Sequence, residues 1–128
     1  MTEEKFLWFL EVVDRARQGD LTAKEILLVI LETERRPTIL GRLAAGDVRP
    51  EDRPDGHHDV VVQVDQKIGQ LRVTRAYFKW ETRIINEVCR KFRGSYRFLG
   101  EPLDGVLAEA ERKHQVEEAF YDYPPEPR

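Results

Sequence analysis

Residues 21–31 have the sequence Leu-Thr-Ala-Lys-Glu-Ile-Leu-Leu-Val-Ile-Leu, and this stretch indicates the fold more clearly than any other. Thr22 and Glu25 have the spacing of a capping box, so a helix is expected to begin here. The run from Ile26 to Leu31 is apolar around the whole circumference of a helix. We therefore expect a central helix that is covered on every side and that ends before Pro37.

A helix is also expected before this central one. Thr2 can cap its start, and Gly19 can take the left-handed conformation that ends it. Its apolar residues recur at helical spacing but spread over a wide face. They are Phe6, Leu7, Trp8, Phe9, Leu10, Val12 and Val13. So broad a face suggests burial against more than one neighbour.

After the central helix, a short helix is expected over residues 37–45, with Gly46 as its stop. The polar residues 46–58 include two prolines and two glycines, which indicates a loop. Residues 59–78 fit two patterns. One is a β-hairpin over about residues 59–75, because valines alternate with other residues there. The other is a single long helix that continues to residue 92.

The hairpin is favoured by the direction of the apolar faces. At ~100° per residue, the apolar centres of residues 60–71 and 77–92 lie roughly 120° apart, so one straight helix cannot bury both. From about residue 77 the pattern is helical, with Gly94 as its expected end. A last helix is predicted from Pro102 to about Tyr121, followed by a proline-rich tail.

The fold expected from these elements is mainly α, a compact bundle of four to five helices with one inserted β-hairpin. Residues 1–121 would form a single globular domain, and residues 122–128 a flexible tail. The longest apolar run is far shorter than the roughly 20 residues of a membrane helix. Cys89 is the only cysteine, so a reducing, cytoplasmic location is expected.

Charged residues make up 35% of the chain, against about 25% in typical domains. With one Asn, one Met and one Cys, this composition is thermophile-like. A GC-rich coding sequence would produce the same bias. The charge is also uneven: residues 65–100 hold nine basic and three acidic side chains, whereas both flanking segments are acidic. A basic centre of this kind pairs internally or recruits an anionic partner.

The candidate binding residues are basic side chains that recur at steps of three and four. On a helix they project within roughly 80° of one another. Arginine forks along such a row can bind phosphates of DNA or RNA, or an acidic protein surface. Alternatively, the acidic residues of the last predicted helix pair with them. The set is Arg72, Arg75, Lys79, Arg83, Arg90, Arg93 and Arg97.

Two short patterns resemble known families. Residues 21–43 resemble the first two helices of winged-helix regulators, and a hairpin over residues 60–73 would be the wing. The predicted loop with Pro50 and Pro54 stands where that family has its recognition helix, so no base reader is evident.

Arg53 and His58 are similar to the Arg-x4-His motif of HEPN-type ribonucleases. That resemblance implies phosphate binding by the arginine and acid–base chemistry by the histidine. The expected helix break at Pro54 and Gly56 stands against it. Asp55, His57, His58 and Asp59 could also supply metal ligands, but no metal-site spacing is present, and an exposed loop accounts for them.

Glu81 falls on the apolar face of the helix expected after residue 77. It is either a buried carboxylate, of the kind that is often functional, or a first-turn residue that favours the helix dipole; we favour the second interpretation. No catalytic constellation is present, so no enzyme activity and no cofactor are expected. The sequence favours a small non-enzymatic binding or regulatory protein that docks on a larger protein partner. One version of this hypothesis makes the protein a component of a nucleic-acid machine. Direct DNA or RNA binding and a HEPN-like ribonuclease are the alternatives.

Overall fold

The computed structural model describes residues 2–98, which form five α-helices and no β-strand. The expected bundle of helices is therefore confirmed for this part of the chain. The predicted last helix and the proline-rich tail lie outside the described residues. The helices are α1 (Glu3–Arg17), α2 (Leu21–Glu32), α3 (Arg36–Ala45), α4 (Arg53–Lys67) and α5 (Tyr77–Phe98). Short 3-10 turns are η1 (Pro50–Asp52), η2 (Ile68–Gln70) and η3 (Thr74–Ala76).

Helix α1 begins and ends as its sequence predicts. The Thr2 hydroxyl accepts a hydrogen bond from the Lys5 amide at 3.2 Å, and Gly19 has a φ of 101°. Helix α2 begins two residues earlier than predicted. Its cap is Asp20, whose carboxylate accepts from the Ala23 amide at 3.1 Å, so the capping box expected at Thr22 is wrong. Aspartate directly after a left-handed glycine caps the helix at least as well as threonine does.

The loop predicted over residues 46–58 holds only for residues 46–49, because η1 and the start of α4 occupy the rest. Pro54 lies in the first turn of α4, where a missing N–H group breaks no helical hydrogen bond. Gly56 is buried, and a Cβ atom there would lie 3.1 Å from a Leu43 methyl group. Both residues therefore occur where the helix tolerates or needs them.

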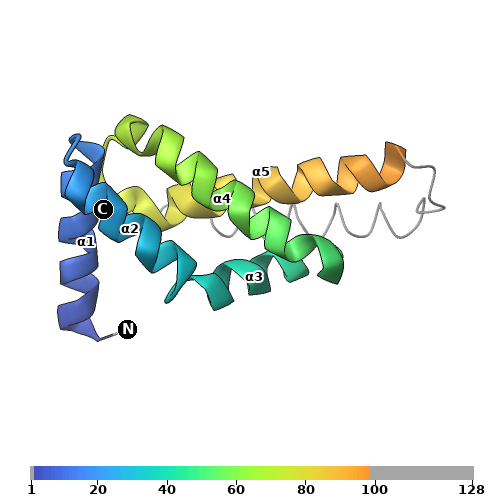
Figure 1. Cartoon of the computed structure of the whole chain (residues 1–128), viewed down its shortest axis with the longest axis horizontal. Helices are drawn as coiled ribbons and strands as arrows, with labels where there is room; N and C mark the ends of the chain where they lie inside the picture. Colours follow the sequence, from blue (N-terminus) through green and yellow to red (C-terminus); the bar gives the residue numbers. More distant parts are fainter. Residues whose placement is uncertain (1, 99–128) are drawn as a thin grey trace.

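The β-hairpin predicted over residues 59–75 is also wrong, and so is one continuous helix through residue 92. The chain reverses between α4 and α5, so that the two helices run antiparallel and side by side (Figure 1). This reversal explains the 120° offset between the two apolar faces. Each face reaches the same core from its own helix, and Val60 and Ile85 are both fully buried. Helix α5 also continues through Gly94 to Phe98.

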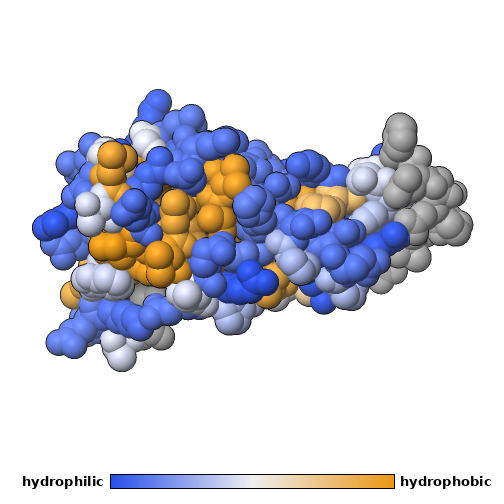
Figure 2. Space-filling view, in the orientation of Figure 1, coloured by the Kyte–Doolittle hydropathy of each residue, from blue (hydrophilic) through white to orange (hydrophobic). Residues whose placement is uncertain are grey.

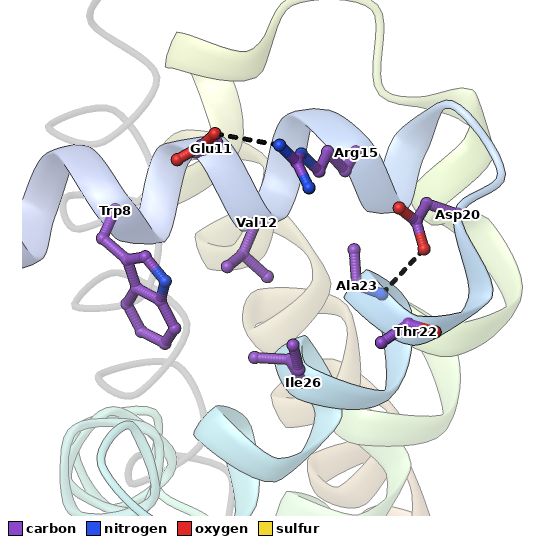
Figure 3. Close-up of a pocket in the computed structure, with 8 residues that line it drawn as sticks. All are labelled: Trp8, Glu11, Val12, Arg15, Asp20, Thr22, Ala23 and Ile26. Atoms are coloured by element: carbon purple, nitrogen blue, oxygen red, sulfur yellow. Dashed lines mark hydrogen bonds and ion pairs between the residues drawn. The ribbon is translucent and has the colours of Figure 1, made fainter.

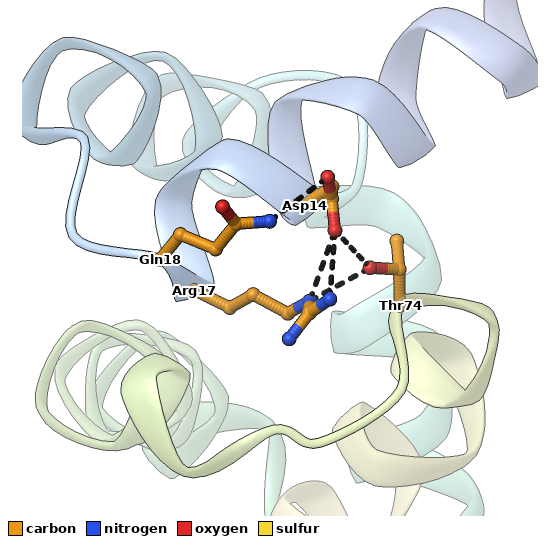
Figure 4. Close-up of polar contacts among 4 residues, drawn as sticks. All are labelled: Asp14, Arg17, Gln18 and Thr74. Carbon is orange, nitrogen blue, oxygen red and sulfur yellow. Dashed lines mark hydrogen bonds and ion pairs between the residues drawn. The ribbon is translucent and has the colours of Figure 1, made fainter.

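Helices α3, α4 and α5 pack along one another, while α1 stands across one end of the molecule with α2 beside it (Figure 1). Aromatic rings join α1 to α5, because the Phe9 ring lies 5.2 Å from that of Tyr77 and 5.3 Å from that of Phe78. A polar cluster also fastens the end of α1 to η3 through Asp14 and Thr74 (Figure 4). Among residues 2–98, no helix is both long and apolar enough to span a lipid bilayer.

Candidate functional site

A hollow of about 230 Å³ lies between α1 and α2 (Figure 3). Pockets that hold small ligands usually have volumes of about 300–1,000 Å³, so this hollow suits protein side chains better than a cofactor. Trp8 and Val12 of α1 and Ile26 of α2 point into the space between the two helices. The residues that line it are Trp8, Glu11, Val12, Arg15, Asp20, Thr22, Ala23 and Ile26.

The hollow follows from the spacing of residues on the two helices. Val12 and Ala23 are buried and form its floor. Trp8, one turn before Val12, and Ile26, about one turn after Ala23, rise from the same faces and form its walls. Because Ala23 carries only a methyl group, the α2 side of the floor leaves space that a larger side chain would fill.

An exposed apolar strip accompanies the hollow. Leu7 and Trp8 of α1 are 57% and 44% exposed, and Ile26 and Val29 of α2 are 38% and 60% exposed. In Figure 2, hydrophobic side chains gather over the half of the molecule that holds α1 and α2, with hydrophilic ones around them. The prediction that the central helix is covered on every side is therefore wrong. We name the hollow together with Leu7 and Val29 the α1–α2 groove.

Charged side chains stand at the edges of the α1–α2 groove. Arg15 donates to Glu11 at 3.2 Å, and Asp20 is engaged as the α2 cap. These groups already have partners before anything binds, so covering them does not leave a new buried charge unpaired.

The basic residues proposed as a binding face are not equivalent in the structure. Arg72 lies in the extended link after η2, and Arg75 lies in η3, so both precede α5. Lys79 is half-buried on α5. Arg93 is buried, and its guanidinium donates to the Gly46 carbonyl at 3.1 Å, so it links the end of α3 to α5 and does not face solvent.

Arg83, Arg90 and Arg97 do form an exposed row on α5. Glu87 lies on the same side, because it follows Arg83 by four residues and precedes Arg90 by three. Each of the three arginines is already engaged in an interaction. The face is therefore mixed in charge and partly committed, which weakens its suitability as a continuous phosphate track.

Glu81 was expected either to be a buried carboxylate or to lie in the first turn of its helix, and the second interpretation was favoured. The structure shows the buried carboxylate, so the first-turn placement is wrong. The helix begins at Tyr77, one turn before Glu81, and the side chain is fully buried. It pairs with Arg35 and accepts a hydrogen bond from the Tyr77 hydroxyl at 2.8 Å. Burial, with the adjacent Glu81, raises the pKa of Tyr77 well above its usual value, which keeps the hydroxyl a donor. This triad fastens α5 to the α2–α3 junction.

The histidine pair is divided between core and surface, and the exposed loop expected for it is wrong. His57 is buried in α4, with Nε2 2.9 Å from the Leu31 carbonyl and Nδ1 3.1 Å from an Arg36 guanidinium nitrogen. These partners assign the proton to Nε2, which donates to the carbonyl, while Nδ1 accepts. His58 is exposed on the next position. Within residues 2–98 no three potential metal ligands converge.

Arg53 and His58 share one helix after all, because α4 begins at Arg53. The Nε of Arg53 donates to the Val48 carbonyl at 3.0 Å. Five positions apart, the two side chains project ~140° from each other around the helix axis. Arg53 is therefore held against the Val48 carbonyl, and His58 points to a different side of α4, so the two side chains do not converge on one site.

The winged-helix resemblance does not extend to the wing, since α4 and the link to α5 occupy residues 60–73. Helix α4 does follow α3, in the place of a recognition helix. Its side chains that are not buried include the acidic residues Asp55, Asp59 and Asp65. Such a helix is poorly suited to enter the DNA major groove. The chain matches no known protein family, no curated protein and no solved structure.

Sequence patterns missed the α1–α2 groove, although one signal pointed to it. The apolar face of the first helix is too broad for one neighbour, and the central helix is apolar all round. Within the fold, α1 and α2 cover each other only in part. The surplus apolar surface is the groove.

Proposed function

We propose that this protein is a non-enzymatic docking protein that binds a larger protein partner through the α1–α2 groove. The observation that carries the proposal is the exposure of Trp8 and Ile26, which line one hollow, together with the exposure of Leu7 and Val29 on the same two helices. Exposed apolar surface that is contiguous and rimmed by polar groups is typical of protein–protein interfaces. We place this activity in the cytoplasm, where the single cysteine, Cys89, stays reduced.

The groove is suited to this role because both of its walls are held in place before binding. Side-chain caps start α1 and α2, and α1 is anchored to the core through Phe9 and to η3 through Asp14. A preformed surface loses little conformational entropy when a partner binds. Trp8 is the expected centre of the contact, since tryptophan is enriched among the residues that dominate binding energy.

The direct test is partner capture from a lysate of the source cell with three versions of the full chain. Wild type and Val73→Asp should retain the same protein, whereas Ile26→Asp should lose it. Val73 is 50% exposed but lies outside the hollow, so it controls for a new surface charge. Equal capture by all three versions would show that the groove is not the binding surface.

The nucleic-acid alternative has weaker support. Arg72 and Arg75 are exposed and precede α5, whereas Arg93 is buried. If this alternative holds, binding to DNA or RNA falls steeply with salt and is reduced by Arg83→Glu and Arg90→Glu. The docking proposal expects no such binding.

A ribonuclease would depend on Arg53 and His58, and His58→Ala would then abolish RNA cleavage. If the protein is a docking protein, neither wild type nor His58→Ala should cleave RNA after extensive purification. Under either alternative, Ile26→Asp should leave the interaction with DNA or RNA unchanged.

A further inference from the structure

We propose that the occupant of the α1–α2 groove is an amphipathic helix of the partner whose polar flanks are basic. This inference rests on the proposed docking function and adds the partner's chemistry to it. The two observations behind it are the shape of the apolar strip and the imbalance of charge on α1 and α2.

The strip has the form that accepts a helix. Trp8 of α1 and Ile26 of α2 line the hollow, and Val29 follows Ile26 by three residues, which places it on the same side of α2. A helix laid in such a groove inserts side chains that recur at positions i, i+3 or i+4, and i+7. The hollow of about 230 Å³ then receives one large apolar side chain or two smaller ones.

The charge around the strip is negative. Residues 2–32 contain seven acidic and four basic side chains. All four basic side chains are held in ion pairs: Lys5 with Glu34, Arg15 with Glu11, Arg17 with Asp14 and Lys24 with Asp65.

Two carboxylates next to the strip have no such partner. Glu4 precedes Trp8 by four residues on α1, and Glu25 precedes Val29 by four residues on α2. Both are exposed, and neither makes an ion pair within residues 2–98. Glu4 belongs to α1 and Glu25 to α2, the two helices that form the walls of the groove, so we expect lysine or arginine on the two flanks of a bound helix to reach them.

This charge pattern separates the proposed occupant from two others. A second copy seated face to face would bring the same acidic edges together, because such an interface is self-complementary in shape but not in charge. An anionic lipid surface would be repelled by the same carboxylates. A helix with basic flanks would instead be attracted by the carboxylates of both α1 and α2.

The test uses two labelled 18-residue helical peptides with an identical leucine stripe, one with lysine on both flanks and one with glutamate. Fluorescence anisotropy against the full chain should show that the lysine peptide binds at least about tenfold tighter at low salt, with a ratio that shrinks as salt rises. Glu4→Lys with Glu25→Lys should remove or reverse this preference. Glu51→Lys with Glu87→Lys makes the same change in net charge at exposed sites outside the groove and should leave the preference in place.

The outcomes distinguish this inference from the docking function. If Ile26→Asp abolishes binding of both peptides but wild type does not discriminate between them, the docking site stands and the basic partner is wrong. If Ile26→Asp has no effect on either peptide, the docking site itself is wrong. A wild-type dimer that Ile26→Asp dissociates would identify a second copy as the occupant and overturn the inference.

Discussion

The Thr74 hydroxyl donates a hydrogen bond to Oδ1 of Asp14 at 2.7 Å, and this bond joins residues 60 positions apart in the chain (Figure 4). Arg17 reaches both residues, with Nε 3.1 Å from Asp14 and 2.8 Å from the Thr74 hydroxyl. Gln18 donates to the other carboxylate oxygen at 3.1 Å. The cluster fixes the end of α1 against the segment that leads into α5, and so positions one wall of the groove.

The first prediction concerns the stability that Asp14 provides. The Thr74 hydroxyl, with smaller contributions from Arg17 and Gln18, lowers the pKa of Asp14 below 3.8. A carboxyl whose native pKa is lowered stabilises the fold above its unfolded pKa, and this contribution is lost as the pH falls through the native value. Asp14→Asn should therefore lower the melting temperature at pH 7, and the difference from wild type should shrink below pH 3.8. Thermal denaturation across this range measures it.

Two results would contradict that account. One is a melting-temperature difference that stays constant as the carboxyl is protonated. The other comes from an NMR titration of the Asp14 carboxyl: Thr74→Val should move its pKa back towards the ordinary value, because the hydroxyl is the largest cause of the shift. No movement would remove Thr74 from the explanation.

The second prediction concerns the buried pair of Arg35 and Glu81. Arg35→Met leaves a fully buried carboxylate with only the Tyr77 hydroxyl as partner, which should cost about 3 kcal/mol in the free energy of unfolding. The double variant Arg35→Met with Glu81→Gln should recover part of this loss, because the uncompensated charge is gone. Urea denaturation of wild type, both single variants and the double variant completes the cycle. Strictly additive effects would show that the two residues do not interact.

The third prediction concerns the close approach of α3 to α5. A Cβ atom on Gly46 would overlap the Cys89 sulfur and lie 3.0 Å from the Cys89 Cβ atom. Gly46→Ala should therefore destabilise the protein by about 1–3 kcal/mol through overpacking. Gly41→Ala is the matched control, since nothing lies within 4 Å of its added methyl group in α3. The control should be neutral or should stabilise by up to about 1 kcal/mol, because alanine favours helices.

Local chemistry predicts both ends of α1, although for α2 a second capping residue, Asp20, takes the place of Thr22. Thr2 and Gly19 bound α1 as expected because a cap and a left-handed glycine act on their own turn. Pro54 and Gly56 misled the prediction of α4 for the opposite reason. Proline is compatible with a first turn, and the glycine is explained by the Leu43 side chain that packs over it. The need for glycine at position 56 therefore depends on a residue 13 positions away in the chain.

The candidate site was less predictable than the fold. A wide apolar face on Trp8 and its neighbours indicates that surface must be covered, but not whether the same chain covers it. Glu81 shows the same difficulty, because the pairing with Arg35 depends on how α5 meets the α2–α3 junction. The arginine set was placed by periodicity, which cannot show that Arg93 turns inward to the Gly46 carbonyl.

The fourth prediction follows from the exposure of the groove residues. Because Ile26 is only partly covered, with 38% of its surface exposed, Ile26→Asp should lower the free energy of unfolding by no more than about 1–2 kcal/mol. Leu27→Asp, at the fully buried neighbouring position, should unfold the protein. Circular dichroism during urea denaturation separates the two cases. A large loss of stability in Ile26→Asp would mean that this side chain belongs to the core and not to a docking surface.

The docking claim is tested most directly by the fluorescence of Trp8. Trp80→Phe leaves Trp8 as the only tryptophan, so its emission reports on the groove alone. On titration with the lysine-flanked helical peptide, we predict a saturable blue shift as Trp8 leaves water, with no shift when Ile26→Asp is added to the same background. An emission spectrum that stays unchanged while the peptide binds would show that the partner helix lies elsewhere and would contradict the account.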